Sequence, residues 1–405
     1  MAAVSDANQS AASADHTSYK CASCGAAQTL APGAEALTCA FCGALTPIAP
    51  TARAIVEHDF AAARGRVRRG PAGSLATGAR EVQCKNCGAR STTTLQAKRC
   101  PFCDEPLVVE LAPSHDTILP DAVLPFAIAR DAGDAAYHAW IRSRWFAPND
   151  LRRRAKRDGL DGVYVPYWTY DSDSLTRYTG SRGEHYYVQE SYTDAQKRRQ
   201  TRRVRKTRWY SAHGTVTVRF NDVQVCASTG VPRQRMAQLE PWHLDGLRPF
   251  DGAYLAGFVA ERYSVDLEDG WTAAQAIMEG RITSAVRGDI GGDEQRVHNM
   301  DVRHADVRFK HLLLPVWLSA FKYDHKVFRV VLNARTGEVA GDRPWSIWKI
   351  VLFVLMIIAI IVGIVLAVQH FKQPAPPEDP PPTQQMQVPV EQSTLTAGDA
   401  DPRAG

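Results

Sequence analysis

Much of the chain between residues 160 and 340 alternates apolar and polar side chains, which is the pattern of half-buried β-strands. A run at 163–171 is aromatic and β-branched, and a strand tolerates its Pro166 only at an edge or a bulge. Residues 215–220 alternate regularly, and the alternation then slips by one position at Asn221-Asp222. That slip predicts a β-bulge.

Two further strands are expected at 311–323 and 326–332, followed by a tight turn at 333–338. One short motif occurs twice, because Tyr164-Val165-Pro166-Tyr167-Trp168 resembles Leu313-Leu314-Pro315-Val316-Trp317. Both motifs follow a predicted helix and are themselves followed by Tyr-Asp. Two related α+β halves are therefore expected.

The two predicted helices precede these motifs. The first takes Asp131 as its N-cap and ends before Pro148. The second begins at Thr272, with Gln275 completing a capping box. The apolar stripe of the first helix is expected to pack in the core and not to form a binding surface; it consists of Tyr137, Trp140, Ile141 and Trp145.

One segment near the C-terminus is apolar on every side. Residues 350–368 contain no charged side chain, and as a helix at about 1.5 Å per residue they span roughly 28 Å, close to the hydrocarbon thickness of a bilayer. A buried core helix is the alternative, but such a helix is seldom apolar all round. We therefore predict a single transmembrane helix. Residues suited to the membrane interface flank it: Trp345, Trp348, Lys349, His370 and Lys372.

Charges around this helix predict its orientation. Basic residues precede it and acidic residues follow it, namely Arg335, Arg343 and Lys349, then Glu378 and Asp379. Reduced cysteines also suit the cytosol, and residues 1–18 carry no secretory signal. The expected location is the inner (cytoplasmic) membrane, with one span, cytoplasmic N-terminal domains and a short C-terminal tail outside.

Eight of the nine cysteines form four Cys-x-x-Cys pairs, arranged as C-x2-C-x14-C-x2-C and C-x2-C-x12-C-x2-C. A two-residue gap lets both thiolates of a pair reach one metal, and two pairs complete the tetrahedral shell that Zn2+ prefers. Glycine follows three of the pairs and Asp104 follows the fourth, where the turn requires positive φ. The predicted Zn2+ ligands are Cys21, Cys24, Cys39, Cys42, Cys84, Cys87, Cys100 and Cys103.

A disulfide framework or a redox pair is the alternative for these cysteines, and the polar N-terminus disfavours it. Neighbouring pairs are expected to share a metal because closing the shorter loop costs less entropy. Four bound thiolates leave no open coordination position, so both sites are expected to be structural. Cys226 ends an alternating strand pattern and is expected to be a buried small hydrophobic residue.

The predicted fold class is α+β, with two N-terminal zinc ribbons, a β-rich α+β middle domain, one C-terminal transmembrane helix and a disordered tail. A formal net charge of +5 is too small for 405 residues to indicate nucleic acid by itself. The expected boundaries are 1–18 disordered, 19–45 first ribbon, 46–80 linker, 81–110 second ribbon, 111–344 middle domain, 345–372 transmembrane helix with flanks, and 373–405 proline-rich disordered tail.

Residues 197–208 read KRRQTRRVRKTR, and Trp209 and Tyr210 follow them. Three interpretations remain open. The run could track a nucleic-acid backbone with aromatic rings stacking on bases, lie against anionic lipid or an acidic protein, or form a merely solvated hairpin. The predicted transmembrane helix favours lipid over nucleic acid. The candidate contact residues are Arg198, Arg199, Arg202, Arg203, Arg205, Lys206 and Arg208.

No pattern in the sequence indicates catalysis. The histidines lack metal-ligand spacing, and the sequence holds neither a nucleophile elbow nor a helical His-Glu-x-x-His. We therefore expect that the chain is not an enzyme. A catalytic β-rich domain stays a third alternative, which a deep pocket with convergent polar groups would favour.

The combination of features is more specific than the ribbons alone. Both ribbons, the two proline motifs and Asn333-x-x-Thr336-Gly337-x-Val339-x-Gly341-x-x-Pro344 together resemble the bacterial family of transcription factor IIB-type zinc-ribbon membrane proteins. The resemblance covers residues 19 to about 370. Some members are mislabelled as primosomal replication-factor-Y-like helicases, but this sequence has no Walker A motif.

The resemblance implies that the eight paired cysteines bind zinc. It also implies that the protein accompanies SPFH-domain or phage-shock-protein-A-like membrane-stress factors and helps to tether them to the membrane. The leading hypothesis is therefore a membrane-anchored zinc-ribbon adaptor. The alternative is a membrane-tethered protein that binds nucleic acid.

Overall fold

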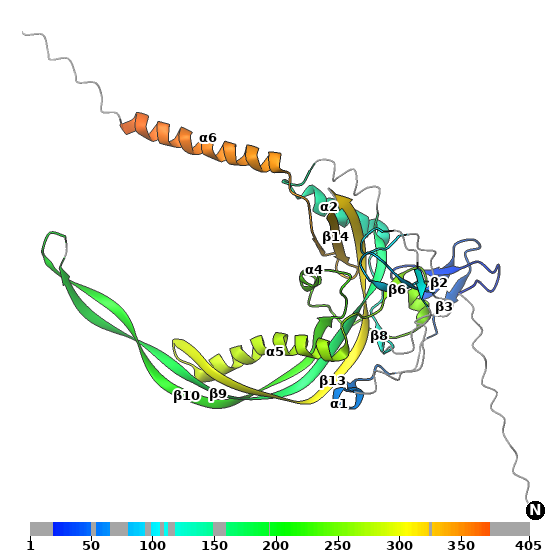
Figure 1. Ribbon diagram of the computed structural model, residues 1–405, viewed down its shortest axis with the longest axis horizontal. Coiled ribbons are helices and arrows are strands. Elements are labelled where there is room, and N and C mark those ends of the chain that lie inside the picture. The colour runs from blue at the N-terminus through cyan, green and yellow to red at the C-terminus, as the bar shows by residue number, and fades with distance from the viewer. Residues whose placement is uncertain are drawn as a thin grey trace, which may run out of the picture. The chain divides into compact units, whose positions relative to one another are not determined.

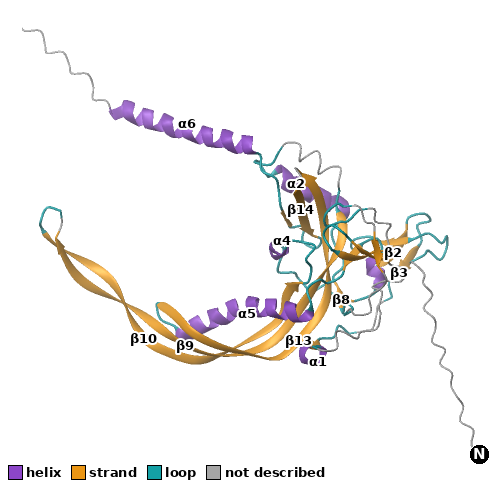
Figure 2. Ribbon diagram, viewed as in Figure 1, coloured by secondary structure: helices purple, strands orange, loops and turns teal. Residues whose placement is uncertain are grey.

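The computed structural model is α+β, and it describes residues 19–49, 54–64, 80–93, 99–105, 109–111, 118–148, 159–193, 195–323 and 326–372 (Figures 1 and 2). The chain divides into two units, Met1–Ser346 and Ile347–Gly405. The predicted disordered segments 1–18 and 373–405 lie outside the described residues, as does most of the predicted linker.

Two sheets make up the first unit. The small sheet has the order β1-β2-β3, and the large sheet contains the other twelve strands. The small sheet consists of β1 Gln28–Leu30, β2 Ala36–Cys39 and β3 Leu45–Pro47. The large sheet consists of β4 His58–Asp59, β5 Arg80–Gln83, β6 Arg90–Thr93, β7 Val109–Leu111, β8 Ala122–Val123, β9 Asp161–Thr193, β10 Arg199–Cys226, β11 Arg248–Pro249, β12 Val259–Glu261, β13 Glu294–Tyr323, β14 Lys326–Asn333 and β15 Val339–Gly341.

Helices cover parts of the large sheet, and one helix lies in the second unit. They are α1 Phe60–Ala63, α2 Arg130–Arg142, α4 Arg233–Ala237, the 3-10 helix η2 Gly252–Leu255, α5 Leu267–Ile290 and α6 Ile347–Lys372. The apolar face of α5 repeats at the helical period and packs against β9 and β10, along the inner side of their curve (Figure 2).

The long strands β9 and β13 pair antiparallel along most of their length. The two proline motifs face each other in this pairing, with Leu313 opposite Pro166 and Pro315 opposite Tyr164. The centre of the arrangement is the pair Val165 and Leu314, both fully buried. The two occurrences of the motif are thus related by a local two-fold rotation.

Both prolines lie where the outer neighbour of the strand changes. On β9, parallel pairing with β12 ends at Tyr164 and antiparallel pairing with β10 begins at Tyr167. On β13, parallel pairing with β8 ends at Leu313 and antiparallel pairing with β14 begins at Val316. Proline lacks an N–H, and it costs no ladder hydrogen bond at such a junction.

Hydrogen bonds repeat around the two prolines. The carbonyl of Pro166 accepts from the N–H of Ala227 at 2.9 Å, and the carbonyl of Pro315 accepts from the N–H of Ala334 at 3.1 Å. Each of these bonds ties the strand to the chain that follows its new outer neighbour.

The tryptophan of each motif also makes the same contacts. Nε1 of Trp168 donates to the carbonyl of Val265 just before α5, and Nε1 of Trp317 donates to the carbonyl of Ile128 just before α2, both at 2.9 Å. A glycine in the first turn of each helix, Gly270 or Gly133, lies against the indole ring. That the middle domain consists of two related α+β halves stays a prediction.

Several predicted elements are confirmed. The bulge lies where it was expected, because the pairing of β10 with β9 shifts register between Phe220 and Val223. Asp222 adopts positive φ there, and its N–H donates to Oδ1 of Asp171. The predicted tight turn joins β14 to β15, with Gly337 at a φ of 81°.

Both predicted helix starts are wrong. The N-cap of α2 is Ala129, and Asp131 lies inside the first turn. The N-cap of α5 is Asp266, and the hydroxyl of Thr272 donates to the carbonyl of Glu268 within the helix. Trp145 follows the end of α2 and is 73% exposed, so the packed stripe is shorter than expected. In both cases the first residue of the helix is determined by the turn between the preceding strand and the helix. The local capping pattern in the sequence does not determine it.

The second unit begins with α6. Its segment Ile347–Gln369 is 23 residues long, and an 18-residue stretch within it has a mean hydropathy of 3.5 and is not buried within the protein. At about 1.5 Å per residue it reaches roughly 34 Å, which is long enough to cross a bilayer. The chain therefore has one described helix that is long and apolar enough to span a membrane.

Replacing Gly270 with alanine should destabilise the protein, since a Cβ there would lie 2.8 Å from Cδ1 of Trp168 and would also meet Tyr170. Overpacking of this kind costs about 1–3 kcal/mol. Gly280→Ala is the matched control, because the same helix leaves open space there, and it should gain about 0.5–1 kcal/mol. Thermal unfolding of the full chain in detergent measures both. A Gly270→Ala variant as stable as Gly280→Ala would contradict this packing.

Candidate metal centres and the basic hairpin

The first cysteine cluster is built on the small sheet. Sγ of Cys21 lies 3.5 Å from Sγ of Cys42, and Sγ of Cys24 lies 3.5 Å from Sγ of Cys39. All four sulfur atoms lie within 4.8 Å of one another. Four sulfurs bound at about 2.3 Å around a tetrahedral Zn2+ are about 3.8 Å apart, so these residues fit one metal ion.

The second cluster has the same geometry. Sγ of Cys84 lies 3.5 Å from Sγ of Cys103, and Sγ of Cys87 lies 3.7 Å from Sγ of Cys100. These four sulfur atoms are also mutually within 4.8 Å. The structure thus groups the eight predicted ligands as expected, with sequence neighbours sharing a cluster. Cys226 is not among them; it lies buried at the end of β10.

The turn that carries each Cys-x-x-Cys pair, here called a knuckle, has the same backbone conformation in all four cases. The residue after each pair has positive φ, and its N–H donates to the carbonyl of the first cysteine of that pair. Asp104 takes this position with a φ of 57°, so it replaces glycine without changing the turn. Both carboxylate oxygens of Asp104 accept from Nη1 of Arg99, at 2.7 and 2.9 Å. The other three positions are Gly25, Gly43 and Gly88.

The electrostatics of the clusters favour a bound cation. Backbone N–H groups of Cys24 and Ser23 lower the pKa of the Cys21 thiol to about 6. In the second cluster the hydrogen bond with Cys100 lowers the pKa of Cys87 to about 5, and the same bond together with burial raises the pKa of Cys100. One thiolate thus opposes the ionisation of its neighbour. A divalent cation removes this conflict because it binds all four thiolates at once.

The two clusters differ in their surroundings. The strands β5, β6 and β7 around the second cluster belong to the large sheet, where β6 pairs with β12 and β12 pairs with β9. Cys84, Cys100 and Cys103 are at most 2% exposed. In the first cluster, by contrast, Cys24 and Cys42 are exposed. The second cluster is therefore part of the main core, and the first lies at a surface.

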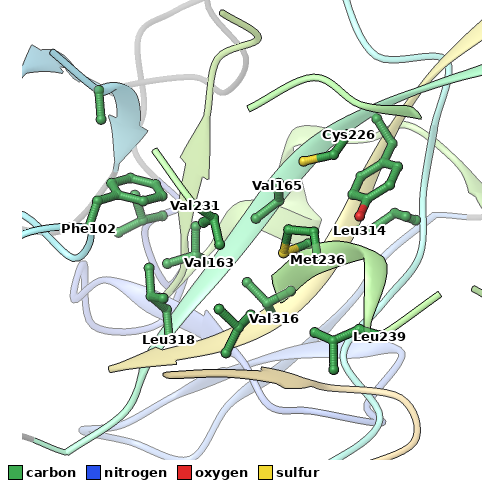
Figure 3. Packing of buried hydrophobic residues seen from close by; sticks show 14 of the residues in the cluster. Phe102, Val163, Val165, Cys226, Val231, Met236, Leu239, Leu314, Val316 and Leu318 are labelled. Atoms are coloured by element: carbon green, nitrogen blue, oxygen red, sulfur yellow. The ribbon is translucent and has the colours of Figure 1, made fainter. Parts of the chain in front are cut away.

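One phenylalanine in each cluster shows the difference directly. Phe41 and Phe102 both lie immediately before the last cysteine of their cluster. Phe102 is fully buried in the same hydrophobic cluster as Val163 and Val231 (Figure 3), whereas Phe41 is 85% exposed. Gly230 makes room for the ring of Phe102, since a Cβ there would lie 2.9 Å from its Cδ1.

Sequence reasoning missed a buried charged group beside the second cluster. The guanidinium of Arg262, just after β12, pairs with the carboxylate of Glu81 on β5, and both side chains are at most 6% exposed. Burial raises the pKa of the neighbouring Glu261 to about 8. No motif marks these residues, because Glu81 and Arg262 meet only through the pairing of β5, β6 and β12.

The predicted basic residues lie on a hairpin at the far end of β9 and β10. The strand β13 accompanies β9 only as far as Gly183, which pairs with Glu294 on one side and Trp209 on the other. Beyond that point residues 184–193 and 199–208 pair only with each other among the described residues (Figure 1). Six of the seven predicted contact residues lie on this part of β10, and Arg198 lies in the turn before it.

Register divides these basic residues between two faces. Directly paired residues share a face, and the faces alternate along each strand. One face, here called the mixed face, carries acidic residues beside the basic ones: Arg202, Lys206 and Arg208 with Glu184 and Glu190. The other, here called the basic face, carries Arg199, Arg203 and Arg205 with Tyr187.

Phe102→Ala should lower the free energy of unfolding by about 3–5 kcal/mol, because it empties a fully buried site. Phe41→Ala, the same change in the other cluster, should stay within about 0.5 kcal/mol of the wild type. Urea unfolding of the full chain in detergent provides the comparison. Equal losses in the two variants would show that the first cluster is packed as tightly as the second.

Comparisons with known proteins add a distant relative. No family model and no solved structure matches the chain. The chain is 25% identical, over 235 residues, to the uncharacterized protein YdjG of Bacillus subtilis (strain 168). The match covers 58% of this chain and 66% of that protein, slightly less than two thirds of its length.

Proposed function

We propose that this protein is a membrane-anchored zinc-binding adaptor that docks a protein partner on its first cysteine cluster. The partner would be a component of an SPFH-type or phage-shock-type membrane-stress assembly, as the sequence resemblance implies. The cytoplasmic face of the inner membrane would be the site of docking.

The membrane part of the proposal rests on α6. Its apolar segment Ile347–Gln369 is exposed all round, so only a lipid phase or another apolar partner can cover it. By the positive-inside rule the unit Met1–Ser346 would face the cytosol and the chain after α6 would face outside.

Zinc is the metal that fits the donor set best. Four thiolates at tetrahedral spacing suit Zn2+ or an iron–sulfur centre, and the two-knuckle fold without extra space between the sulfur atoms favours a single Zn2+. When bound, the metal would supply folding energy and no open coordination position. Both centres are therefore proposed to be structural.

The exposure of the first cluster is the observation that carries the docking proposal. Phe41 and Leu45, on the knuckle and on β3, are 85% and 67% exposed. The strand β3 is an edge of the small sheet, and all three of its residues are exposed. An edge strand next to exposed apolar side chains suits an added strand or apolar segment of another protein.

A nucleic-acid-binding protein is the second candidate, and the basic hairpin favours it. Residues 184–208 hold eight basic residues against three acidic ones, which is enough to follow a phosphate backbone. The expectation that the chain is not an enzyme stays a prediction.

The metal proposal predicts two Zn2+ per chain by plasma mass spectrometry of the purified protein. Cys24→Ser/Cys42→Ser should lose one Zn2+ and keep the large sheet folded, since that cluster is exposed. Cys84→Ser/Cys100→Ser should lose the other and also the near-ultraviolet circular dichroism of the core, because these thiols are buried in it. Iron in place of zinc, or equal unfolding in both variants, would contradict the assignment.

The docking proposal predicts that a protein co-purifies with the tagged chain from its native membranes. Phe41→Ala/Leu45→Ser should lose that partner, because it removes the exposed apolar surface without touching a buried site. Ile277→Ala is the matched control, since Ile277 is an exposed apolar residue on α5. A partner retained by Phe41→Ala/Leu45→Ser, or nuclease-sensitive nucleic acid with no enriched protein, would overturn the proposal.

A further inference from the structure

The outer part of the hairpin is a two-stranded ribbon that extends beyond the end of β13. A two-stranded ribbon without a third strand or a covering helix is marginally stable in water. Residues 184–193 and 199–208 extend past the ends of β13 and α5 (Figure 1). At the base of this segment, Oδ2 of Asp293 accepts from the N–H of His185 at 2.7 Å, and Oε1 of Glu294 accepts from the hydroxyl of Thr207 at 3.0 Å. Both outer edges of this ribbon also leave backbone groups unpaired.

Arginine–tyrosine stacking holds the ribbon in shape. The guanidinium carbon of Arg203 lies 4.0 Å from the centre of the Tyr187 ring, and that of Arg208 lies 5.0 Å from the Tyr186 ring. Arg202 covers Tyr192 in the same way at 5.5 Å. These contacts fix the charged groups in place, while their N–H donors still reach outward.

The two faces of the ribbon offer different electrostatic surfaces. On the mixed face, Glu190 accepts from Lys206 at 2.8 Å and lies 3.6 Å from Arg202. On the basic face the residues paired across the strands are Thr193 with Arg199, Gln189 with Arg203 and Tyr187 with Arg205, and none of them is acidic. At the base of the basic face, Glu294 lies 2.7 Å from Nε2 of His185 and accepts from Thr207. Farther out, the charges of Arg199 and Arg203 are available to an external anion, whereas much of the charge on the mixed face is already compensated.

We propose that the basic face of the hairpin binds the headgroups of anionic lipids at the membrane surface. Guanidinium groups on successive same-side positions donate to lipid phosphate, and Tyr187, at 55% exposure, suits the boundary between headgroup and acyl chain. The apolar helix α6 on the same chain brings the hairpin to a bilayer. This inference relies on the proposed membrane anchor but not on the docking of a protein.

Nucleic acid fits the same face less well. A single strand is bound through aromatic rings that are free to stack on bases. On the basic face the ring of Tyr187 is covered by the guanidinium group of Arg203. On the mixed face the rings of Tyr186 and Tyr192 are covered in the same way by Arg208 and Arg202. A duplex would still meet the positive charge, so nucleic acid enters the experiment as a competing outcome.

Hydrogen–deuterium exchange tests the proposal on the full chain in nanodiscs. The discs contain either phosphatidylcholine alone or phosphatidylcholine with phosphatidylglycerol, and the measured quantity is the exchange rate of peptides from 184–208. Binding of the native ribbon slows its opening. We expect exchange roughly tenfold slower with phosphatidylglycerol than without it.

Two charge-matched variants make the test specific to one face. Arg203→Gln/Arg205→Gln and Arg202→Gln/Lys206→Gln each remove two positive charges and one arginine–tyrosine contact. In the first variant, the exchange rates with and without phosphatidylglycerol should differ by less than about twofold. The second variant should keep most of the difference between the two kinds of disc. Each variant is compared with itself in phosphatidylcholine, so a change in intrinsic stability cancels.

Three outcomes would overturn the proposal. Equal loss in both variants would show attraction by net charge alone. If a single-stranded RNA oligonucleotide slows the exchange in phosphatidylcholine discs and phosphatidylglycerol does not, the face would be assigned to nucleic acid. No slowing under either condition would leave the hairpin solvated. Failure of the anchor itself would be seen separately, as a chain that does not enter the discs.

Discussion

The antiparallel pairing of β9 with β13 is the contact on which the rest of the structure depends. It joins segments far apart in the sequence, and Val165 and Leu314 are buried at its centre. Both outer neighbours of each strand take their positions from it: β12 and β10 beside β9, and β8 and β14 beside β13. Because β9 continues from this core into the hairpin, where β10 pairs with it, one strand takes part in both the core and the exposed basic segment.

This pairing also explains why two similar cysteine clusters have different surroundings. The strand β12 lies beside β9 and pairs with β6, so the second cluster is joined to the main sheet and its Phe102 is buried. The small sheet of the first cluster is joined to the rest by backbone hydrogen bonds, such as that from Leu30 to the carbonyl of Ala256, and by Leu30 and Leu37, which pack in the same core cluster as Tyr164. Its Phe41 remains exposed. The same local motif therefore yields a core element in one place and a surface element in the other.

The sequence predicted what depends on local chemistry. Cysteine spacing grouped the eight ligands, and the slip at Asn221-Asp222 located a bulge. Prediction from the sequence failed where the local structure depends on contacts between segments far apart in the chain. The start of α5 is set by a turn whose carbonyl at Val265 is held by Trp168, and a capping pattern at Thr272 could not reveal that contact. The burial of Phe102 and the pair of Glu81 with Arg262 likewise require β6 to meet β12, which no short motif shows.

The strand register shows on which face each residue of the basic run lies, which its composition does not show. The seven predicted contact residues by themselves indicate only a positive surface, because a strand alternates its side chains between two faces. Pairing with β9 places Glu184 and Glu190 on one of those faces, and no acidic residue pairs with Arg199, Arg203 or Arg205 on the other. A shift of one residue would exchange the partners of every arginine. The bulge between Phe220 and Val223 shifts the pairing of β10 with β9 by one residue, so the register in the hairpin differs by one residue from the register in the core.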